Sequence, residues 1–194
     1  MKLRHLVAVA ISIFMLSACS VPASKYAPIK TSIAEPASIP ETDMNDPQAV
    51  AREVTTERDD FEKKTDYLGP GLTANNGWPV CFFTVIVLKY DDGRSFGDIY
   101  IDDSYYGEDW RLYDRAFDSN GNSLTVSIFD RKREAVSGEY IYSEIIEIKV
   151  PLAYLEGSQQ SGLKFKIAGK RGERILSIPA GYIKGLLSVA NRSQ

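Results

Sequence analysis

Much of the chain after residue 80 alternates apolar and polar positions with the period of two that β-strands produce. In the longest run, residues 140–150, the side chains of Tyr142, Glu144, Ile146 and Ile148 fall on one face. Shorter alternating runs occur at 99–102, 124–128 and 163–167, with sequences rich in Gly, Asn and Asp nearby. Several strands with turn signals at near-regular spacing predict a mainly β fold, an antiparallel β-sandwich or open barrel.

The segment 80–90 departs from this alternation because it is apolar almost throughout. A short continuous apolar run is typical of a strand that is buried on both faces. The segment contains Cys81, and no base or helix start lies near it that would activate a thiol. We therefore expect Cys81 to be buried and inert, with a reactive thiol or an intermolecular disulfide as the alternatives.

The C-terminal segment has apolar residues at the three- and four-residue spacing of a helix. Its apolar positions are Tyr182, Ile183, Leu186, Leu187 and Ala190. Pro179 precedes them, as is common at the start of a helix. We expect a C-terminal amphipathic helix that packs on the sheet, with a partner-binding helix as the alternative.

The segment 46–68 carries mixed signals. Asp46-Pro47 is a good helix start, because Asp can cap the helix and Pro suits its first turn. The following residues, Val54-Thr55-Thr56, favour a strand. We predict a short helix followed by a strand, although a longer helix would also place Val50, Val54 and Phe61 on one face.

One turn sequence carries two signals. Asn120-Gly121 suits the positive φ angles of a type I′ turn and predicts a hairpin. Asp118, Asn120 and Asn122 also imitate the start of an EF-hand loop. The twelfth position of such a loop must be Glu, and here it is Phe129, so we reject a calcium site of this type.

The first nineteen residues have the pattern of a secretory signal. A basic start with Lys2 and Arg4 precedes the apolar run 6–16, which is shorter than the roughly 18–20 residues of a membrane span. Small residues then lead to Cys19. The sequence Leu16-Ser17-Ala18-Cys19 resembles the lipobox of bacterial lipoproteins.

The lipobox resemblance implies cleavage before Cys19, a diacylglycerol on its sulfur and a fatty acyl chain, such as palmitate, on its new amino group. Several acyl chains on one residue give stable membrane anchoring. Ser20 rather than Asp follows the cysteine, which implies sorting to the outer membrane. We expect the domain to face the periplasm, with the cell surface as the alternative, and we expect no cofactor besides this lipid.

The composition changes between the signal and the domain. Residues 20–45 contain four prolines among Ser, Ala, Thr and Lys and show no apolar period, which is typical of a flexible spacer. The predicted division is therefore a signal peptide at 1–18, a lipidated N-terminus with its spacer at 19–45, and a single β-rich domain at 46–194.

Composition excludes several classes of chemistry. The single histidine, His5, lies in the predicted signal, so the mature chain cannot form a Ser-His-Asp triad or a His-ligated metal site. Loss of Lys2 and Arg4 leaves 21 basic against 26 acidic residues, a formal charge of −5. An acidic protein without a basic cluster is a poor candidate for binding nucleic acid. The spacings Gly-x-Ser-x-Gly, at 93–97, and Ser-x-x-Lys, at 161–164, each occur once. The first lacks the histidine that would activate its serine, and a short spacing alone is a weak signal, so we do not expect an enzyme.

The stretch 91–110 is the most charged part of the chain and holds the candidate site residues. Asp98 and Asp102 lie four apart on a predicted strand, hence on one face. The candidate ligands for a calcium ion are Asp98, Asp102, Asp103, Glu108 and Asp109, although a solvated acidic face is the favoured interpretation. The candidate contacts for a protein or a sugar are Tyr105, Tyr106 and Trp110, together with Asp98 and Asp102.

These observations predict a lipid-anchored envelope protein that is a non-catalytic binding or assembly module. Its partners would be the membrane, through the lipid, and an envelope protein; the oligomeric state is left open. The alternative is a calcium- or glycan-binding module, or a carboxylate-based hydrolase, that uses the Asp98–Asp109 region.

Overall fold

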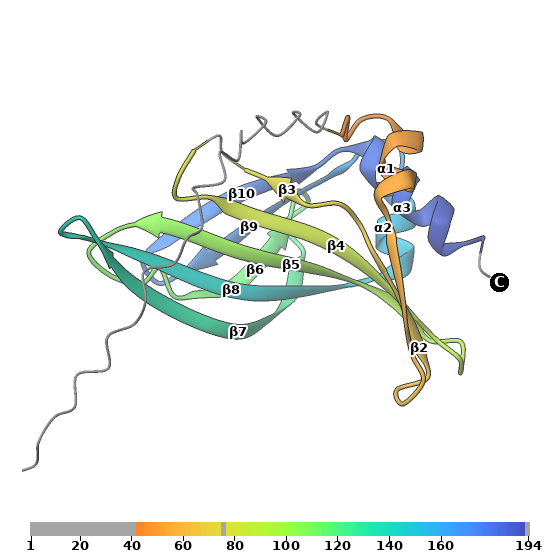
Figure 1. Cartoon of the computed structure of the whole chain (residues 1–194), viewed down its shortest axis with the longest axis horizontal. Helices are drawn as coiled ribbons and strands as arrows, with labels where there is room; N and C mark the ends of the chain where they lie inside the picture. Colours follow the sequence, from red (N-terminus) through yellow and green to blue (C-terminus); the bar gives the residue numbers. More distant parts are fainter. Residues whose placement is uncertain (1–41, 75–76, 193–194) are drawn as a thin grey trace, which may run out of the picture. The chain divides into compact units, whose positions relative to one another are not determined.

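The computed structural model describes residues 42–74 and 77–192 of the chain (Figure 1). The predicted signal peptide, Cys19 and the spacer up to residue 41 lie outside the described residues. All described residues belong to one compact unit, residues 40–194. This unit already includes Met44, which packs against the core from within the predicted spacer.

The fold is mainly β, as predicted, with 54% of the described residues in strands and 16% in helices. The helices are α1 (Pro47–Glu53), α2 (Leu152–Gly157) and α3 (Ala180–Ala190). The strands are β1 (Thr55–Asp59), β2 (Lys64–Leu68), β3 (Leu72–Thr73), β4 (Cys81–Tyr90), β5 (Ser95–Tyr106), β6 (Tyr113–Asp118), β7 (Ser123–Val136), β8 (Glu139–Pro151), β9 (Leu163–Gly169) and β10 (Gly172–Ile178).

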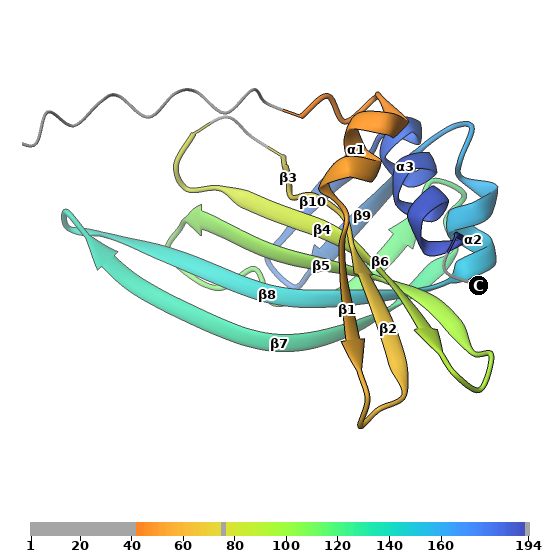
Figure 2. The same ribbon diagram turned by 45° about the vertical axis from the view of Figure 1, so that its right-hand side comes forward.

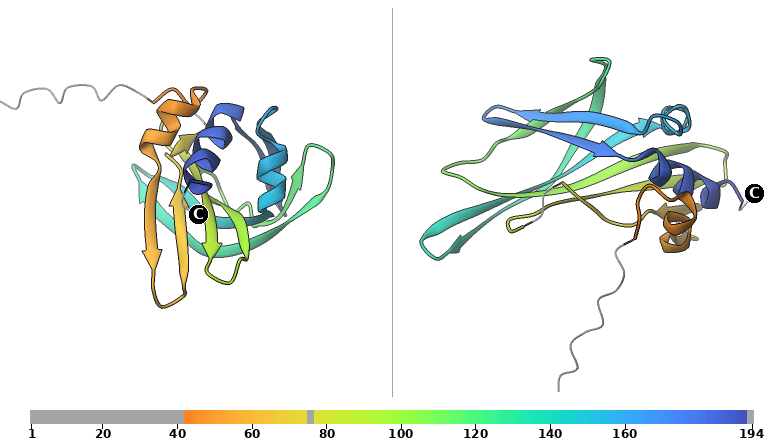
Figure 3. Two further views of the ribbon diagram at one scale, coloured as in Figure 1. Left: turned by 90° about the vertical axis from the view of Figure 1, so that its right-hand side faces the viewer. Right: turned by 90° about the horizontal axis from the view of Figure 1, so that it is seen from above.

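Within residues 42–74 and 77–192, ten strands form one open antiparallel sheet. Their order is β1-β2-β4-β5-β8-β7-β6-β9-β10, and β3 pairs beside β4. The sheet curls, so that β9 and β10 form a layer that faces the layer of β4 and β5 (Figure 3). The apolar core fills the space inside this curl.

The alternating pattern decides which side chains enter that space. On β8, Ile146 and Ile148 lie opposite Ile101 and Ile99 of β5, and all four are fully buried. The outward positions between them are more polar. The apolar run 80–90 forms β4, but it is not buried on both faces as predicted: Phe82 points outward and is 40% exposed.

The three helices gather at one end of the sheet, which we call the helical end (Figure 2). The predicted C-terminal helix is α3, and its five predicted apolar positions are buried. It packs on the sheet and also on α1, because Gly185 lets the two backbones approach closely, and Gly181 lies against Asn45 just before α1. A Cβ atom at Gly185 would lie only 2.6 Å from the carbonyl oxygen of Pro47 and 2.7 Å from Cβ of Val50.

Tyr182 of α3 completes the hydrogen bonding of the sheet where β2 leaves β4. Its hydroxyl accepts from the backbone N–H of Val85 at 3.2 Å and donates to the carbonyl of Pro70 at 2.8 Å. Buried backbone groups must be paired, so this hydroxyl replaces a strand partner that β2 no longer supplies. No helix in the described ranges has the length and apolar content needed to cross a membrane.

Two local predictions are confirmed in outline and corrected in detail. Segment 46–68 is a short helix followed by a hairpin, and Phe61 lies fully exposed in the turn of that hairpin. The hairpin at 118–123 exists, but Gly121 has a positive φ and Asn120 does not, so the turn is not type I′. Asp118 organises it instead, because its Oδ1 accepts the backbone N–H groups of Asn120 and Asn122, both at 2.8 Å.

Candidate functional site

The end of the sheet opposite the helices has a polar interior. Asp103 on β5 and Glu144 on β8 are direct cross-strand partners, and both side chains are fully buried. Three arginines reach them from other parts of the chain. We call these five residues, Asp103, Glu144, Arg111, Arg131 and Arg174, the polar cluster.

Glu144 uses both of its carboxylate oxygens. Oε1 accepts the Tyr105 hydroxyl at 2.5 Å and the backbone N–H of Leu112 at 3.0 Å. Oε2 accepts the backbone N–H of Tyr113 at 3.1 Å and Nε of Arg131 at 3.0 Å. One buried carboxylate thus joins β5, β7 and the loop before β6.

Asp103 makes the second set of contacts, across the curl of the sheet. Its Oδ2 accepts Nη1 of Arg111 at 2.9 Å and the hydroxyl of Tyr113 at 2.7 Å. Its Oδ1 forms an ion pair with Nη2 of Arg174 on β10 at 2.8 Å. The ion pair with Arg174 connects two strands that are far apart in the sheet order.

These contacts make the buried carboxylates structural anions. Buried charges are stable only when they are paired and hydrogen-bonded, and both acids meet that condition. Burial raises the pKa of Tyr105 and of Tyr113, so their hydroxyls stay protonated as hydrogen-bond donors. Burial, with the neighbouring Asp103 charge, also raises the pKa of Cys81, which is fully buried as predicted and therefore a poor nucleophile.

The polar cluster holds the loop between β5 and β6 in one conformation. Leu112 has φ +58°, a left-handed backbone that is unfavourable for a residue with a side chain. The bond from its N–H to Glu144 helps to hold it there. The guanidinium of Arg111 lies 3.9 Å above the Tyr105 ring, a favourable cation–π contact.

A depression of about 640 Å³ lies at the surface above this loop. We call it the rim depression, and it is lined by Tyr105, Tyr106, Gly107, Glu108, Asp109, Arg111 and Arg171. Tyr106 is 46% exposed, whereas Tyr105 is buried. Arg171, in the β9–β10 turn, forms an ion pair with Asp109, so two loops build the wall together.

The predicted contact Trp110 supports this loop from the side. Its ring meets the ring of Tyr142 edge-on, with centroids 4.9 Å apart. The Tyr142 hydroxyl also donates to the carbonyl of Glu108 at 3.0 Å. Trp110 and Tyr105 therefore position the rim, and Tyr106 is the predicted aromatic residue that presents an exposed ring there.

The structure separates the five predicted acidic ligands. Asp98 and Asp102 point to the outer face of β5, as their spacing predicts, but Asp103 points inward to the arginines. Glu108 and Asp109 lie in the rim. Within the described residues, no three side chains of His, Cys, Asp or Glu converge as metal ligands would.

Asp98 is a buried carboxyl in a very different setting from the polar cluster. It is only 5% exposed although it lies on the outer face. Burial and then the hydrogen-bonding contact with the Glu147 carboxylate raise the pKa of Asp98 to about 7. Two close carboxylates share a proton more readily than they both ionise.

The three arginines of the polar cluster are not among the residues predicted from the sequence. The sequence does contain an indication for Arg174. It lies two and four residues before the apolar Leu176 and Ile178, which places it on the inward face of β10. For Arg131 the alternation misleads. A bulge between Ile128 and Asp130 shifts the register by one residue, so that Arg131 and not Asp130 faces Glu144.

Neither a family model, nor a curated protein, nor a solved structure matches this chain.

Proposed function

We propose that this protein is a lipid-anchored, non-catalytic binding module of the cell envelope. It sits at the periplasmic face of the outer membrane and binds an envelope protein through the rim depression. The lipobox at 16–19 and the proline-containing spacer that follows it support the anchor and the tether.

The observation that carries a non-catalytic role is the pairing of Asp103 and Glu144. Both carboxylates hold arginine side chains, and Glu144 also binds two backbone N–H groups of the rim loop. General acid–base catalysis needs a group whose proton can move at working pH and that can reach a substrate. These two acids are instead buried scaffolding that fixes the shape of a surface loop.

The composition of the rim depression favours a protein as its ligand. An exposed tyrosine, Tyr106, stands next to charges of both signs, Asp109 and Arg171. Tyr and Arg are the residue types enriched in protein interfaces. A pre-formed surface loop also loses little conformational entropy on binding, which favours a useful affinity.

The calcium, glycan or hydrolase alternative has less support. Its residues are divided among the outer face of β5, the interior and the rim, so they do not act at one place. A calcium ion needs six to eight oxygen ligands at one point.

Site-specific photocrosslinking in intact cells tests the proposal. A photoreactive amino acid replaces Tyr106 in the full chain with its native signal. We expect one dominant adduct with an envelope protein. The matched control places the same amino acid at Phe61, which is fully exposed in the β1–β2 turn at the other end of the molecule (Figure 1).

Two results would contradict the proposal. Equal adducts from positions 106 and 61 would show unspecific proximity, and no adduct from position 106 would show that the rim has no protein partner. A Cys19→Ser variant tests the anchor separately, because it should leave the protein out of the membrane fraction.

A further inference from the structure

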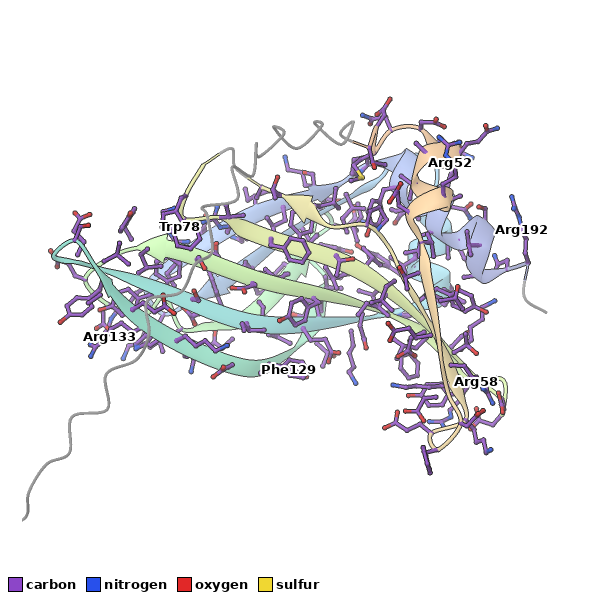
Figure 4. The ribbon with its side chains drawn as sticks, in the orientation of Figure 1. Arg52, Arg58, Trp78, Phe129, Arg133 and Arg192 are labelled. Atoms are coloured by element: carbon purple, nitrogen blue, oxygen red, sulfur yellow. The ribbon has the colours of Figure 1, made fainter. Side chains whose placement is uncertain are left out.

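The outer face of the sheet carries a second hollow that the sequence analysis did not foresee. It has a volume of about 360 Å³, at the small end of ligand sites. Its wall includes Trp78, Phe82, Ile145, Ser104 and Ser143, with Asp102 among them. We call it the outer groove, and it begins beside Trp78, at the end of the molecule opposite Arg52 and Arg192 (Figure 4).

The strand register places Asp102 in an apolar row. Its cross-strand neighbours are Phe82 on β4 and Ile145 on β8. Among the described residues, Oδ1 of Asp102 is covered and has no hydrogen-bond donor. Burial raises the pKa of Asp102, because these neighbours do not solvate its charge. A cation with its own N–H donors would stabilise the charge of a carboxylate in this position.

Three other polar side chains of the groove, Ser104, Ser143 and Lys132, have partners of their own. The hydroxyls of Ser104 and Ser143 bond each other at 2.6 Å. Lys132 forms an ion pair with Asp130 at 3.4 Å, on the solvent side of β7. The positive charge of Lys132 partly offsets the effect of burial on Asp102. Glu134 also lines the groove but is exposed to water, so Asp102 is the carboxylate of the groove with a covered oxygen. One partly buried and one exposed carboxylate are too few ligands for a calcium ion.

Two exposed aromatic rings stand at the groove. Trp78 is 67% exposed and Phe82 is 40% exposed. The face of an aromatic ring attracts an ammonium or guanidinium group, and Trp does so most strongly. Exposed aromatic rings around a small hollow are also the usual anchors of a protein interface.

We propose that the outer groove binds a basic side chain, lysine or arginine, of a partner protein. The aliphatic stem lies against Trp78 and Phe82, and the charged head reaches Asp102. A protein is the source because the groove adjoins the rim depression: Ser104 lines the groove, and Tyr106, two residues further along β5, lines the rim. In this choice of source the inference rests on the proposed function.

The test uses the full lipidated chain, purified in detergent and labelled at the indole nitrogens. The chain has two tryptophans, so two indole signals report on the two sites: Trp78 on the groove and Trp110 on the rim. Trp78→Phe assigns the signals. The probe is Nα-acetyl-lysine N-methylamide, and the uncharged probe is the norleucine compound of the same length.

We expect the lysine probe to shift the Trp78 signal saturably and to leave Trp110 in place. The norleucine probe should shift neither signal to saturation. Asp102→Asn should weaken the lysine probe about tenfold, the size of one charge-assisted contact. The titrations run at pH 8, above the pKa of about 7 of Asp98, so that Asp98 is ionised. Asp98→Asn then removes a charge from the same face of the same strand and should change the affinity less than about twofold.

Each opposite result overturns the inference. No shift of Trp78 with the lysine probe shows that the groove takes no cation. An equal response to norleucine shows apolar adsorption, and an equal loss in Asp98→Asn shows general charge attraction. If Asp102→Asn fails to fold, the comparison of the lysine and norleucine probes on the unaltered chain still shows whether the groove binds a cation. Because no partner protein is present, this result is independent of the crosslinking at position 106.

Discussion

The interior of the curled sheet is apolar at the helical end and polar at the opposite end. At the helical end, side chains such as Ile99, Ile148 and Leu186 form a dry core that α3 helps to cover. At the other end, the inward positions hold Asp103 and Glu144 with three arginines. A single strand, β5, passes from one end to the other without changing its inward face.

The difference follows from what covers each end. Apolar side chains are stable where a helix removes them from water. No helix lies over the polar end in the part of the chain that the structure describes (Figure 2). The arginine side chains there are each between 22% and 30% exposed, so they shield the acids from water while keeping part of their own hydration. The hydrogen bonds of the polar end are directional, so they fix the position of a surface loop. Apolar side chains in the same place would pack against the loop without fixing its direction.

Removal of Glu144 should have the largest effect on stability, because it disrupts the polar end. Glu144→Ala leaves Arg131 and two backbone N–H groups without their buried acceptor. Loss of one partner in a buried ion pair costs about 3–5 kcal/mol in the free energy of unfolding. Urea denaturation of the full chain measures this cost. Glu139→Ala on the same strand is the control, and because Glu139 is exposed, it should change the stability by less than about 0.5 kcal/mol.

A Glu144→Ala cost below about 1 kcal/mol would contradict this account of the polar end. The polar cluster would then contribute little to the free energy of unfolding. Another interaction would have to fix the conformation of the rim loop.

An added methyl group should disturb the helical end by a smaller amount. Gly185→Ala places a Cβ against Pro47 and Val50, where α1 and α3 touch. Overpacking of a tight contact costs about 1–3 kcal/mol, read as a lower midpoint of urea unfolding. Gly157→Ala in α2 is the matched control, because nothing lies within 4 Å of its new Cβ. That change should be neutral or slightly stabilising, since Ala favours a helix. Equal effects of the two changes would contradict the close packing of α1 and α3.

Asp98 lies beside another acid, Glu147, whereas the buried acids of the polar cluster lie beside arginines. In the folded protein Asp98 keeps its proton up to about pH 7, whereas an unfolded Asp loses it near about 3.9. Between these pH values the folded state binds more protons, so the contribution of Asp98 to stability falls as pH rises from about 4 to 7. It stays level above pH 7.

Asp98→Asn removes this penalty and should stabilise the protein at pH 8, by at most about 4 kcal/mol for a difference of about three pKa units, with no gain at low pH. Urea denaturation in buffers on both sides of pH 7 measures the difference from the unaltered chain. The exposed Asp114→Asn change serves as control and should show no such pH dependence. A gain of the same size at low and high pH would show that the proton on Asp98 is not the cause.

The period of the apolar residues and the turn sequences are local properties of the chain. They are enough to predict the type of each element and the faces of its side chains. A strand with period two has its two faces set wherever it is placed, so the inward positions of β8 and the outward positions of Asp98 and Asp102 are readable from the chain. The apolar stripe of α3 is readable for the same reason. The mainly β fold with a C-terminal helix follows from these signals.

The groups that each strand face contacts depend on how distant segments of the chain pack together. One bulge reverses the faces of β7, so that Arg131 reaches Glu144, and no local pattern marks that extra residue. The curl of the sheet brings Arg174 of β10 to Asp103 of β5 and leaves Asp102, one residue away, in an apolar row on the other face. A side chain's direction is set by its own backbone, but its partners are set by segments distant in the chain, and that is why neighbouring acids acquire opposite roles.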